Sequence, residues 1–526
     1  MLFNSYVFAA FFAVFMAAYW AMRKHVAVQN GLIVLGSWVF YGWWDERFLI
    51  LILVSIVTDY VCGWGAAGGR MPTAQTLKAF AFFWLSCVVV LGIAGADAYW
   101  IVYWLAGFTA LLLAARSIFD RLDETARRKS YLWLSVAVNL GVLGVFKYFN
   151  FFAAQLQQAV GTLGWELGPL TLNIILPVGI SFYTFQTLSY TIDCYRRDVK
   201  ATPHIVELAA YVSFFPQLVA GPIERAHRLL PQFFKQRSLS VEQFTSGVWL
   251  FLWGLCKKIV IADNLAVVAD TVFAEPGAYG SGALLAGLLA FTFQIYCDFS
   301  GYSDMARATA RLLGFELMLN FNIPYVARTP SEFWQRWHIS LSSWLRDYLY
   351  IPLGGNRLGP WSIYRNLSLT MLLGGLWHGA NWTFVAWGAY HGLILIIYRV
   401  FDVDRKLARP ARSAGLGALR DTLSVCIMFA LTVIGWLFFR ASSITDLAVF
   451  AGGIAALQPG GLALWAEISP LILALILVQS IQIKRKELEV FASTPGIAGL
   501  TLKSLMAYSL LFLAAGGNQQ FIYFDF

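Results

Sequence analysis

The sequence predicts an all-α polytopic integral membrane protein, and three observations lead to that fold class. Of the 526 residues, 59% are hydrophobic and only 13% are charged, whereas a soluble protein carries about a quarter charged residues. The apolar residues are grouped into runs long enough to cross a hydrocarbon core about 30 Å thick, which takes about 20 helical residues. Short loops that carry Lys and Arg separate the runs, as at the cytoplasmic ends of membrane helices.

The apolar runs predict ten or more helices, because lipid leaves the backbone N–H and C=O groups no other partner. The clearest runs are 48–64, 80–115, 131–146, 422–439, 468–483 and 505–515. The sequence has no long polar linker, low-complexity region or evident repeat, so residues 1–526 are interpreted as a single membrane domain. The distribution of apolar, polar and charged residues along the chain suggests four segments. These are N-terminal spans at 1–150, a chemically distinct core at 176–392, C-terminal spans at 420–518 and an aromatic tail at 519–526.

The distribution of basic residues predicts the orientation of the chain. The first apolar run, 7–22, is followed by Arg23 and Lys24 and has no basic residue ahead of it, which is the reverse of a signal peptide. The positive-inside rule therefore places the N-terminus on the external side. Counted from the last basic cluster, 484–486, the final run carries the chain outward, so residues after Ala515 are expected to be external as well.

The net charge of +9 does not point to nucleic acid, because the basic residues flank apolar spans instead of covering one face. Orientation in an anionic bilayer explains this distribution, so the expected partner is membrane lipid. The six cysteines are scattered without a paired motif. We therefore expect neither disulfides nor a metal site.

The core at 176–392 is where ionisable residues enter apolar stretches, and such residues tend to face a cavity or a partner. Five of the six histidines lie there, and three of them, His338, His378 and His391, fall in the motifs considered below. The chain has no Walker A loop, HExxH, GxSxG or paired-Cys motif, which excludes the commonest ATPase, zinc-peptidase and serine-hydrolase classes. Histidine, with an ordinary pKa of about 6.5, remains the candidate for proton transfer near neutral pH.

His378 is a single imidazole among small residues, between Gly375 and Gly379 in an otherwise apolar run. The glycines admit close approach by another helix or by a narrow ligand. His378 therefore either carries the chemistry or bonds to a neighbouring helix. His391 is interpreted as a polar contact between helices.

His338 lies in the segment 331–348, whose spacing predicts one amphipathic or re-entrant helix with Ser331 as its N-cap. The aromatic residues of this segment fall toward one side. That pattern is also typical of an interfacial helix with an aromatic belt, so the segment alone leaves a purely structural role open.

Two further features carry weaker signals. Asp298 and Asp304 adjoin an apolar span, where we expect them to pair with Arg307 or Arg311, with cation binding as the alternative. The loop that ends at Arg357 contains two glycines and could cradle a phosphate through its backbone N–H groups. Gly-Asn turns are common, so that pattern is not specific.

Several longer motifs occur along the chain in a fixed order. They are Leu176-Pro177-Val178-Gly179-Ile180-Ser181-Phe182, Phe215-Pro216 with Ala220-Gly221-Pro222-Ile223, Asp298-Phe299-Ser300-Gly301-Tyr302-Ser303-Asp304, the stretch 334–356 around His338, and Gly375-Leu376-Trp377-His378-Gly379. Together they resemble the motifs of the membrane-bound O-acyltransferases, and within that family those of the membrane subunits of bacterial alginate O-acetylation. The resemblance covers most of the chain.

The resemblance implies a many-helix fold around a central tunnel, with re-entrant or interfacial helices and a catalytic core at 176–392. It also implies a cytoplasmic acyl thioester donor such as acetyl-CoA, no tightly bound cofactor, and a hydroxyl acceptor on an exported envelope polysaccharide. We expect His378 to act as general base, with His338 orienting the thioester or stabilising the oxyanion. Trp337, Asn381 and Arg357 are candidate substrate-binding residues.

The aromatic tail resembles the C-terminal motif of this acylation class, including the small partner peptide of lipoteichoic acid D-alanylation. We predict that this chain is a bacterial inner-membrane protein with a periplasmic SGNH-type acetyltransferase as its partner. Tyr523 is predicted to accept the acyl group and to present it to that partner. A phenol, with a pKa of about 10, is easier for histidine to activate than a sugar hydroxyl. The alternative is that Tyr523 only anchors the tail at the membrane interface.

Two other functions remain open. A polysaccharide or proton-coupled transporter would use the histidines as a proton relay, but transporters often contain inverted repeats, and none is evident in this sequence. A scaffold for an envelope polysaccharide complex would tolerate the loss of either histidine. The interpretation that joins all the motifs is an O-acyltransferase.

Overall fold

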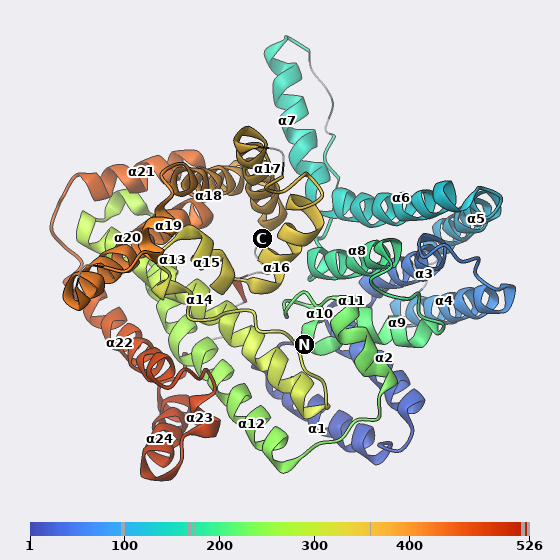
Figure 1. The fold of residues 1–526 in the computed structure, drawn as a ribbon, viewed down its shortest axis with the longest axis horizontal. Helices are drawn as coiled ribbons and strands as arrows, with labels where there is room; N and C mark the ends of the chain where they lie inside the picture. The colour runs from blue at the N-terminus through green and yellow to red at the C-terminus, as the bar shows by residue number, and fades with distance from the viewer. Residues whose placement is uncertain are drawn as a thin grey trace. The chain divides into compact units, whose positions relative to one another are not determined.

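A computed structural model describes residues 1–95, 100–165, 168, 170–172, 174–357, 359–411, 413–516 and 521–522. These residues form α-helices joined by loops and short 3-10 or π-helical turns, and no described residue lies in a β-strand (Figure 1). The all-α fold predicted from the sequence is therefore confirmed. The chain divides into two compact units, Met1–Ser240 with Thr309–Leu317 and Val241–Ala308 with Met318–Phe526.

The first unit is built from apolar helices that share a buried polar cluster. Its helices are α1 (Tyr6–Ala21), α2 (Val26–Asp45), α3 (Leu49–Ala66), α4 (Thr73–Ala94), α5 (Ile101–Phe119), α6 (Glu124–Leu143), α7 (Phe149–Thr162), α8 (Ile180–Arg196), α9 (Ile205–Val212), α10 (Phe215–Leu218) and α11 (Ala226–Leu229). Asp59 of α3 accepts hydrogen bonds from Ser135 and Asn139 of α6 and from Thr191 of α8. Because a buried carboxylate needs such donors, this cluster ties three helices together.

The second unit contains the histidines that the sequence singled out. Its helices are α12 (Val241–Leu255), α13 (Asp263–Ala274), α14 (Ser281–Leu312), α15 (Pro330–Arg336), α16 (Ile339–Leu345), α17 (Pro360–His378), α18 (Trp382–Val400), α19 (Val403–Ala408), α20 (Ala414–Arg440), α21 (Ile444–Ala455), α22 (Leu462–Arg485), α23 (Val490–Ser493) and α24 (Gly496–Phe512). π-Helical turns at Cys256–Ala262 and Arg346–Tyr350 follow α12 and α16. The helices α17 and α18 form a packed pair that supports the site described below.

Eight helical stretches of the described residues are long and apolar enough to cross a membrane. They are Val26–Ala66, Thr73–Ala94, Ile101–Phe119, Glu124–Thr162, Ser281–Leu312, Trp382–Val400, Ala414–Arg440 and Leu462–Arg485. Shorter apolar helices occur at Tyr6–Ala21, Ile444–Ala455 and Gly496–Phe512. This pattern is that of a multi-pass membrane protein, while the external placement of both termini stays a prediction.

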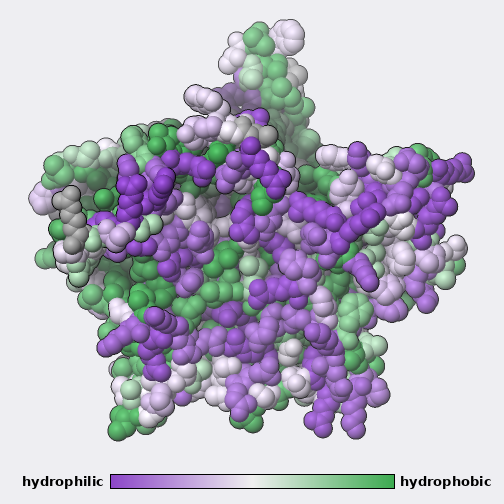
Figure 2. Space-filling view, viewed as in Figure 1, coloured by the Kyte–Doolittle hydropathy of each residue, from purple (hydrophilic) through white to green (hydrophobic). Residues whose placement is uncertain are grey.

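Large apolar side chains are exposed on several helices, as expected for surfaces that face lipid. Phe152 and Leu156 of α7 and Leu500 and Leu511 of α24 are all exposed. Figure 2 shows hydrophobic residues over the surface of α7, at the top of the view. A water-soluble protein rarely exposes so many large apolar groups together.

The apolar run at 80–115 forms two helices instead of one, because α4 stops at Gly95. This glycine has φ 86° and caps α4 through its backbone N–H to the carbonyl of Leu91. A residue with a side chain rarely adopts that backbone conformation. The chain therefore turns at Gly95, and α5 begins at Ile101.

Candidate active site

His338 lies at the junction of α15 and α16, where the backbone breaks. The predicted single helix over 331–348 is wrong, because His338 has left-handed backbone angles, φ 43° and ψ 53°, and separates two helices of seven residues each. The N-cap of α15 is Thr329 and not Ser331, with the Thr329 side chain accepting from the Glu332 N–H at 3.2 Å. Pro330 takes the first helical position, where its missing N–H costs nothing.

Two backbone hydrogen bonds hold this break in place. The N–H of Ile339 donates to the carbonyl of Asn320 at 2.9 Å, and the N–H of Asn322 donates to the carbonyl of Arg336 at 2.9 Å. They lie on either side of His338, so the segment before α15 fixes its unusual backbone. Strained backbone angles persist only where the surrounding structure determines them. The neighbouring segment therefore fixes the direction of the His338 side chain.

The imidazole of His338 is buried and hydrogen-bonded. Its Nδ1 lies 3.2 Å from Asn320 Oδ1, which also accepts from the hydroxyl of Ser340 at 2.9 Å. The other end of the Asn320 amide donates to the hydroxyl of Ser303 at 3.0 Å. Since Oδ1 can only accept, the network assigns the proton of the neutral ring to Nδ1 and the lone pair to Nε2. Burial lowers the pKa of His338 to about 3, so the ring is neutral at physiological pH.

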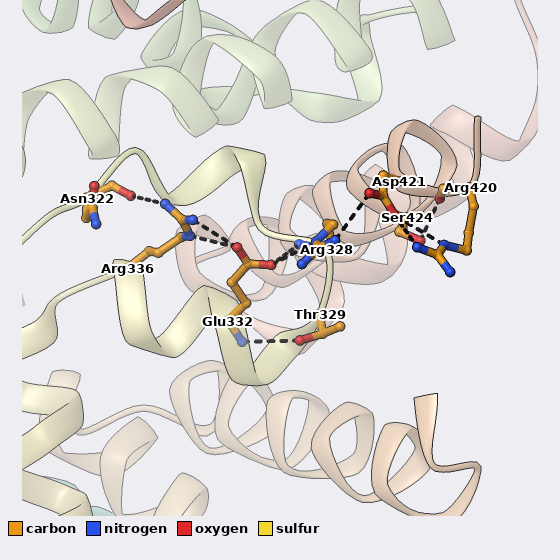
Figure 3. A network of polar contacts seen from close by, with 8 residues as sticks. All are labelled: Asn322, Arg328, Thr329, Glu332, Arg336, Arg420, Asp421 and Ser424. Atoms are coloured by element: carbon orange, nitrogen blue, oxygen red, sulfur yellow. Dashed lines mark hydrogen bonds and ion pairs between the residues drawn. The ribbon is translucent and has the colours of Figure 1, made fainter. Parts of the chain in front are cut away.

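An ionic network fixes the helix that leads to His338 (Figure 3). Glu332 pairs with Arg336 at 2.9 Å and with Arg328 at 3.6 Å. Arg328 also pairs with Asp421 of α20 at 3.3 Å, and Asp421 pairs with Arg420 at 3.1 Å. Burial alone would raise the pKa of Glu332, but the Arg328 and Arg336 contacts outweigh it and lower the pKa. The network therefore connects α15 to α20 with a charged carboxylate.

His378 is the last residue of α17, and close helix packing places it. A Cβ at Gly375 would collide with the carbonyl oxygen of Phe384, and a Cβ at Gly388 would collide with that of Met371. Only glycine lets α17 and α18 approach so closely. The sequence left open whether the glycines near His378 admit another helix or a narrow ligand. The structure shows that Gly375 admits another helix.

Aromatic rings surround the imidazole of His378. The ring centroids of Trp387 and Phe439 lie 5.1 Å and 5.2 Å from that of His378, both in edge-to-face orientation. The side chain is 5% exposed. The centroid of the His338 ring is 6.5 Å away. The structure thus brings together the two histidines that are 40 positions apart in the sequence.

His378 lies in the wall of a cavity of about 900 Å³ within the second unit. Cavities that bind small molecules usually enclose about 300 to 1,000 Å³. Trp334 and Trp387 line the same cavity, whereas His338 and Trp337 are not among its described lining residues. His378 is therefore the one of the two paired histidines that a molecule in this cavity would meet.

The other end of the cavity is charged and exposed. Arg346, Arg399 and Arg405 line it together with Asp402 and Asp404. All five side chains belong to exposed residues. Arginine is well suited to phosphate and carboxylate groups, because its guanidinium donates two parallel hydrogen bonds. The cavity thus combines an exposed mouth that carries charges of both signs with buried aromatic residues beside His378.

The other candidate residues are placed less directly. Trp337 is buried against Trp436, with ring centroids 4.6 Å apart. Asn381 caps α18 by accepting from the Thr383 N–H at 3.1 Å, and its amide donates to the carbonyl of Ser442 at 3.0 Å. Arg357 is exposed, and Tyr523 lies outside the described residues. Trp337, Asn381 and Arg357 are not among the described residues that line the cavity.

Asn320, Ser340, Arg399 and Arg405 are site residues that the sequence reasoning missed. Asn320 and Ser340 act through hydrogen bonds to each other and to His338, which only the folded chain brings together. Arg399 and Arg405 come directly after an apolar run, where the positive-inside rule already accounts for them. His391 was expected to be a polar contact between helices. Its ring centroid lies 4.8 Å from that of Trp387, and its side chain lies against Gly435 of α20.

Comparison with known proteins adds the following relationships. The model of the membrane-bound O-acyltransferase (MBOAT) family matches residues 88–438. The chain is 41% identical over 447 residues to the probable alginate O-acetylase AlgI of Pseudomonas aeruginosa, with 84% of this chain and 73% of the relative covered. It is 39% identical over 457 residues to the protein of the same name from Pseudomonas putida, covering 86% and 80%. It is 32% identical over 491 residues to the peptidoglycan O-acetyltransferase of Helicobacter pylori, covering 87% and 80%.

Proposed function

Since the chain belongs to the membrane-bound O-acyltransferase family, we propose that it moves an acetyl-type group from a cytoplasmic thioester to hydroxyls of an exported envelope polysaccharide. The observation that carries this proposal is the position of His378. It lies at the aromatic end of a cavity with arginines at its mouth, 6.5 Å from the ring of a second buried histidine. A proton acceptor beside a space of this size suits acyl transfer to a hydroxyl.

The cavity fits an acyl thioester of coenzyme A as the donor. Coenzyme A carries phosphate groups at one end and the acyl thioester at the other. Arg399 and Arg405 at the exposed mouth are suited to the phosphates, while His378 is at the buried end. Bound in this direction, the donor would present its thioester carbonyl to His378.

His378 serves as the general base of the transfer. Its neutral imidazole takes the proton of the attacking hydroxyl as the oxygen bonds to the thioester carbonyl carbon. The carbon–sulfur bond then breaks, and the departing thiolate takes the proton from the imidazolium. The rings of Trp387 and Phe439 around His378 exclude water, which would otherwise hydrolyse the acyl group.

His338 orients a reacting group. With its proton on Nδ1 toward Asn320, the neutral ring can accept a hydrogen bond only at Nε2. An oxyanion needs a donor, so this tautomer favours an orienting role over oxyanion stabilisation. The fixed backbone at the junction of α15 and α16 keeps that lone pair in one direction.

Tyr523 is the proposed first acceptor of the acyl group. Its phenol would attack the thioester with help from His378, and the resulting ester would pass the acyl group to a periplasmic SGNH-type transferase. The relatives named for alginate and peptidoglycan O-acetylation support an envelope polysaccharide, alginate-like, as the final acceptor.

Mass spectrometry of the protein after incubation with acetyl-CoA tests this proposal. We expect an acetyl adduct on Tyr523 that is absent in both His378→Ala and Tyr523→Phe. His25→Ala is the matched control, because His25 is exposed and its side chain does not cap α2. Acetyl transfer that proceeds unchanged in His378→Ala would overturn the assignment of the base. Transfer to polysaccharide without any adduct would remove Tyr523 from the pathway.

A further inference from the structure

A buried ion group, consisting of Lys258, Asp263 and Asp298, lies in the second unit outside the cavity. The Nζ of Lys258 is 2.7 Å from Asp263 Oδ1 and 2.9 Å from Asp298 Oδ1, and the three side chains are 6%, 4% and 2% exposed. The expected pairing with Arg307 or Arg311 is therefore wrong for Asp298, whereas Asp304 does pair with Arg307 at 3.4 Å. Burial lowers the pKa of Lys258, but the two carboxylates raise it by more, so the ammonium stays charged.

Two glycines explain why the lysine reaches this carboxylate. A Cβ at Gly254 of α12 would lie 2.6 Å from the carbonyl oxygen of Gly301 of α14, and a Cβ at Gly301 would lie 2.7 Å from that of Gly254. The backbones therefore touch, and the π-helical turn after α12 meets α14. A second ion pair forms six residues further along α14, where Lys257 Nζ lies 2.7 Å from Asp304 Oδ2.

Asp298 has a second partner, which comes from the end of the chain. The N–H of Ile522 donates to Asp298 Oδ2 at 2.7 Å. Phe521 and Ile522 are 2% and 6% exposed, and the ring of Phe521 stacks on Tyr302 with centroids 4.7 Å apart. These two residues, which we call the tail anchor, are thus seated on α14 by a charge-assisted hydrogen bond and a ring contact.

The seat of the tail anchor adjoins His338. The ring of Phe299, the residue after Asp298, lies 6.0 Å from the ring of Phe521 and 4.6 Å from that of His338. One aromatic ring therefore separates the tail anchor from the histidine. The residue that follows Ile522 in the sequence is Tyr523.

We propose that Asp298, held by Lys258, is a positioning residue that fixes the tail anchor next to Phe299, whose ring contacts His338, and thereby supports the acyl relay through Tyr523. The proposal rests on the acyl relay through Tyr523 described above and adds the device that holds the relay in place. One oxygen of Asp298 is committed to the lysine and the other to the tail. The rigid ion group thereby gives the end of the chain a fixed point inside the protein.

The chemistry of Asp298 suggests two variants with opposite outcomes. In Asp298→Ala, Lys258 keeps Asp263 as its partner at 2.7 Å, but the N–H of Ile522 loses its acceptor. In Asp298→Asn, the single amide oxygen can still accept from Ile522, while the amide NH2 takes the place of the oxygen that faced Lys258. Asp304→Ala is a matched control, because it removes an ion-paired carboxylate of the same helix that makes no described contact with the tail anchor.

Hydrogen–deuterium exchange of the full-length protein in detergent, read on the peptide 517–526, tests the anchor. We expect exchange of the Ile522 amide to be at least about 10-fold faster in Asp298→Ala than in the parent, because the hydrogen bond that protects it is gone. Asp298→Asn should recover part of the protection, because Lys258 and Ile522 compete for its one acceptor oxygen, and Asp304→Ala should keep it. Unchanged exchange in Asp298→Ala would overturn the anchor.

Acetylation of Tyr523 in the same samples tests what the anchor is for. We expect the adduct formed from acetyl-CoA to fall about 10-fold in Asp298→Ala and to recover in Asp298→Asn, in step with the exchange. A tail released in Asp298→Ala with normal Tyr523 acetylation would overturn the positioning role. The exchange result does not depend on acetylation, so a parent without the adduct would overturn the relay while the exchange still decides whether Asp298 holds the tail.

Discussion

The two histidines of the site are buried to a similar degree, yet their surroundings differ. The ring of His338 is hydrogen-bonded to Asn320, and the ionic network of Glu332 includes Arg336, two residues before His338. His378 is surrounded by the rings of Trp387 and Phe439 and lines the cavity. A reacting base needs access to a substrate, whereas an orienting group needs a fixed direction. The difference therefore supports the proposed roles, with His378 as the base and His338 as the orienting group.

Replacement of His378 should have the largest effect on acyl transfer. His378→Ala removes the group that takes the hydroxyl proton, so we expect kcat to fall about 10²- to 10⁴-fold. Thioester turnover with purified protein and radiolabelled acetyl-CoA measures the loss. His378→Gln is the control for packing. A loss smaller than that of His338→Ala would reverse the roles of the two histidines.

Loss of the hydrogen bond to His338 should have a smaller effect. Asn320→Ala removes the acceptor that fixes the imidazole tautomer, so we expect kcat to fall about 10- to 100-fold with little change in KM. Asn322→Ala is a matched control, because Asn322 contacts Arg336 through its backbone. Full activity of Asn320→Ala would mean that His338 needs no fixed tautomer.

The arginines at the cavity mouth should affect donor binding and not the chemical step. For Arg399→Ala we expect KM for acetyl-CoA to rise about 3- to 10-fold at unchanged kcat, because a contact to phosphate stabilises the ground state and the transition state equally. Lys406→Ala, a nearby cation outside the described cavity lining, should change neither constant. A lower kcat in Arg399→Ala would place the arginine nearer the reaction.

The ionic network of α15 should show the smallest effect, on stability. Glu332→Gln removes a charge that is only about three-quarters buried, so we expect the free energy of unfolding to fall by about 1 kcal/mol or less. The folded pKa of Glu332 is lowered from its ordinary value of 4.5. The stabilisation is therefore present above pH 4.5 and lost as the pH falls through the lowered value. Thermal melting against pH should show this acid-side loss in the parent and not in Glu332→Gln.

The helices and the two histidine motifs were predictable from the sequence for a simple reason. Apolar runs and their charged flanks are local patterns, and lipid permits little besides helices. His338 and His378 stand out because ionisable residues are rare in such runs. The break at His338 was not predictable, because the spacing of 331–348 continues through it and the backbone bonds that impose it come from Asn320 and Asn322.

The partner of Asp298 shows the same limit. Arg307 and Arg311 are the basic residues nearest to it along α14, so a local pattern suggested them. The lysine that pairs with Asp298 is 40 positions earlier and arrives through the contact of Gly254 with Gly301. A single sequence does not show that Gly254 and Gly301 contact each other, because they lie on different helices. Long-range contacts of this kind, and the cavity they enclose, follow from the fold as a whole.

The contact between α17 and α18 has a consequence for engineering the acyl specificity of this protein. At Gly375 and Gly388 the neighbour is a carbonyl oxygen of the opposite helix, and a main-chain atom cannot rotate away as a side chain can. The contact between these two helices is therefore closed to redesign at Gly375 and Gly388. Libraries that aim at longer or shorter acyl groups should leave both glycines unaltered and vary Trp334 and Trp387, which line the cavity.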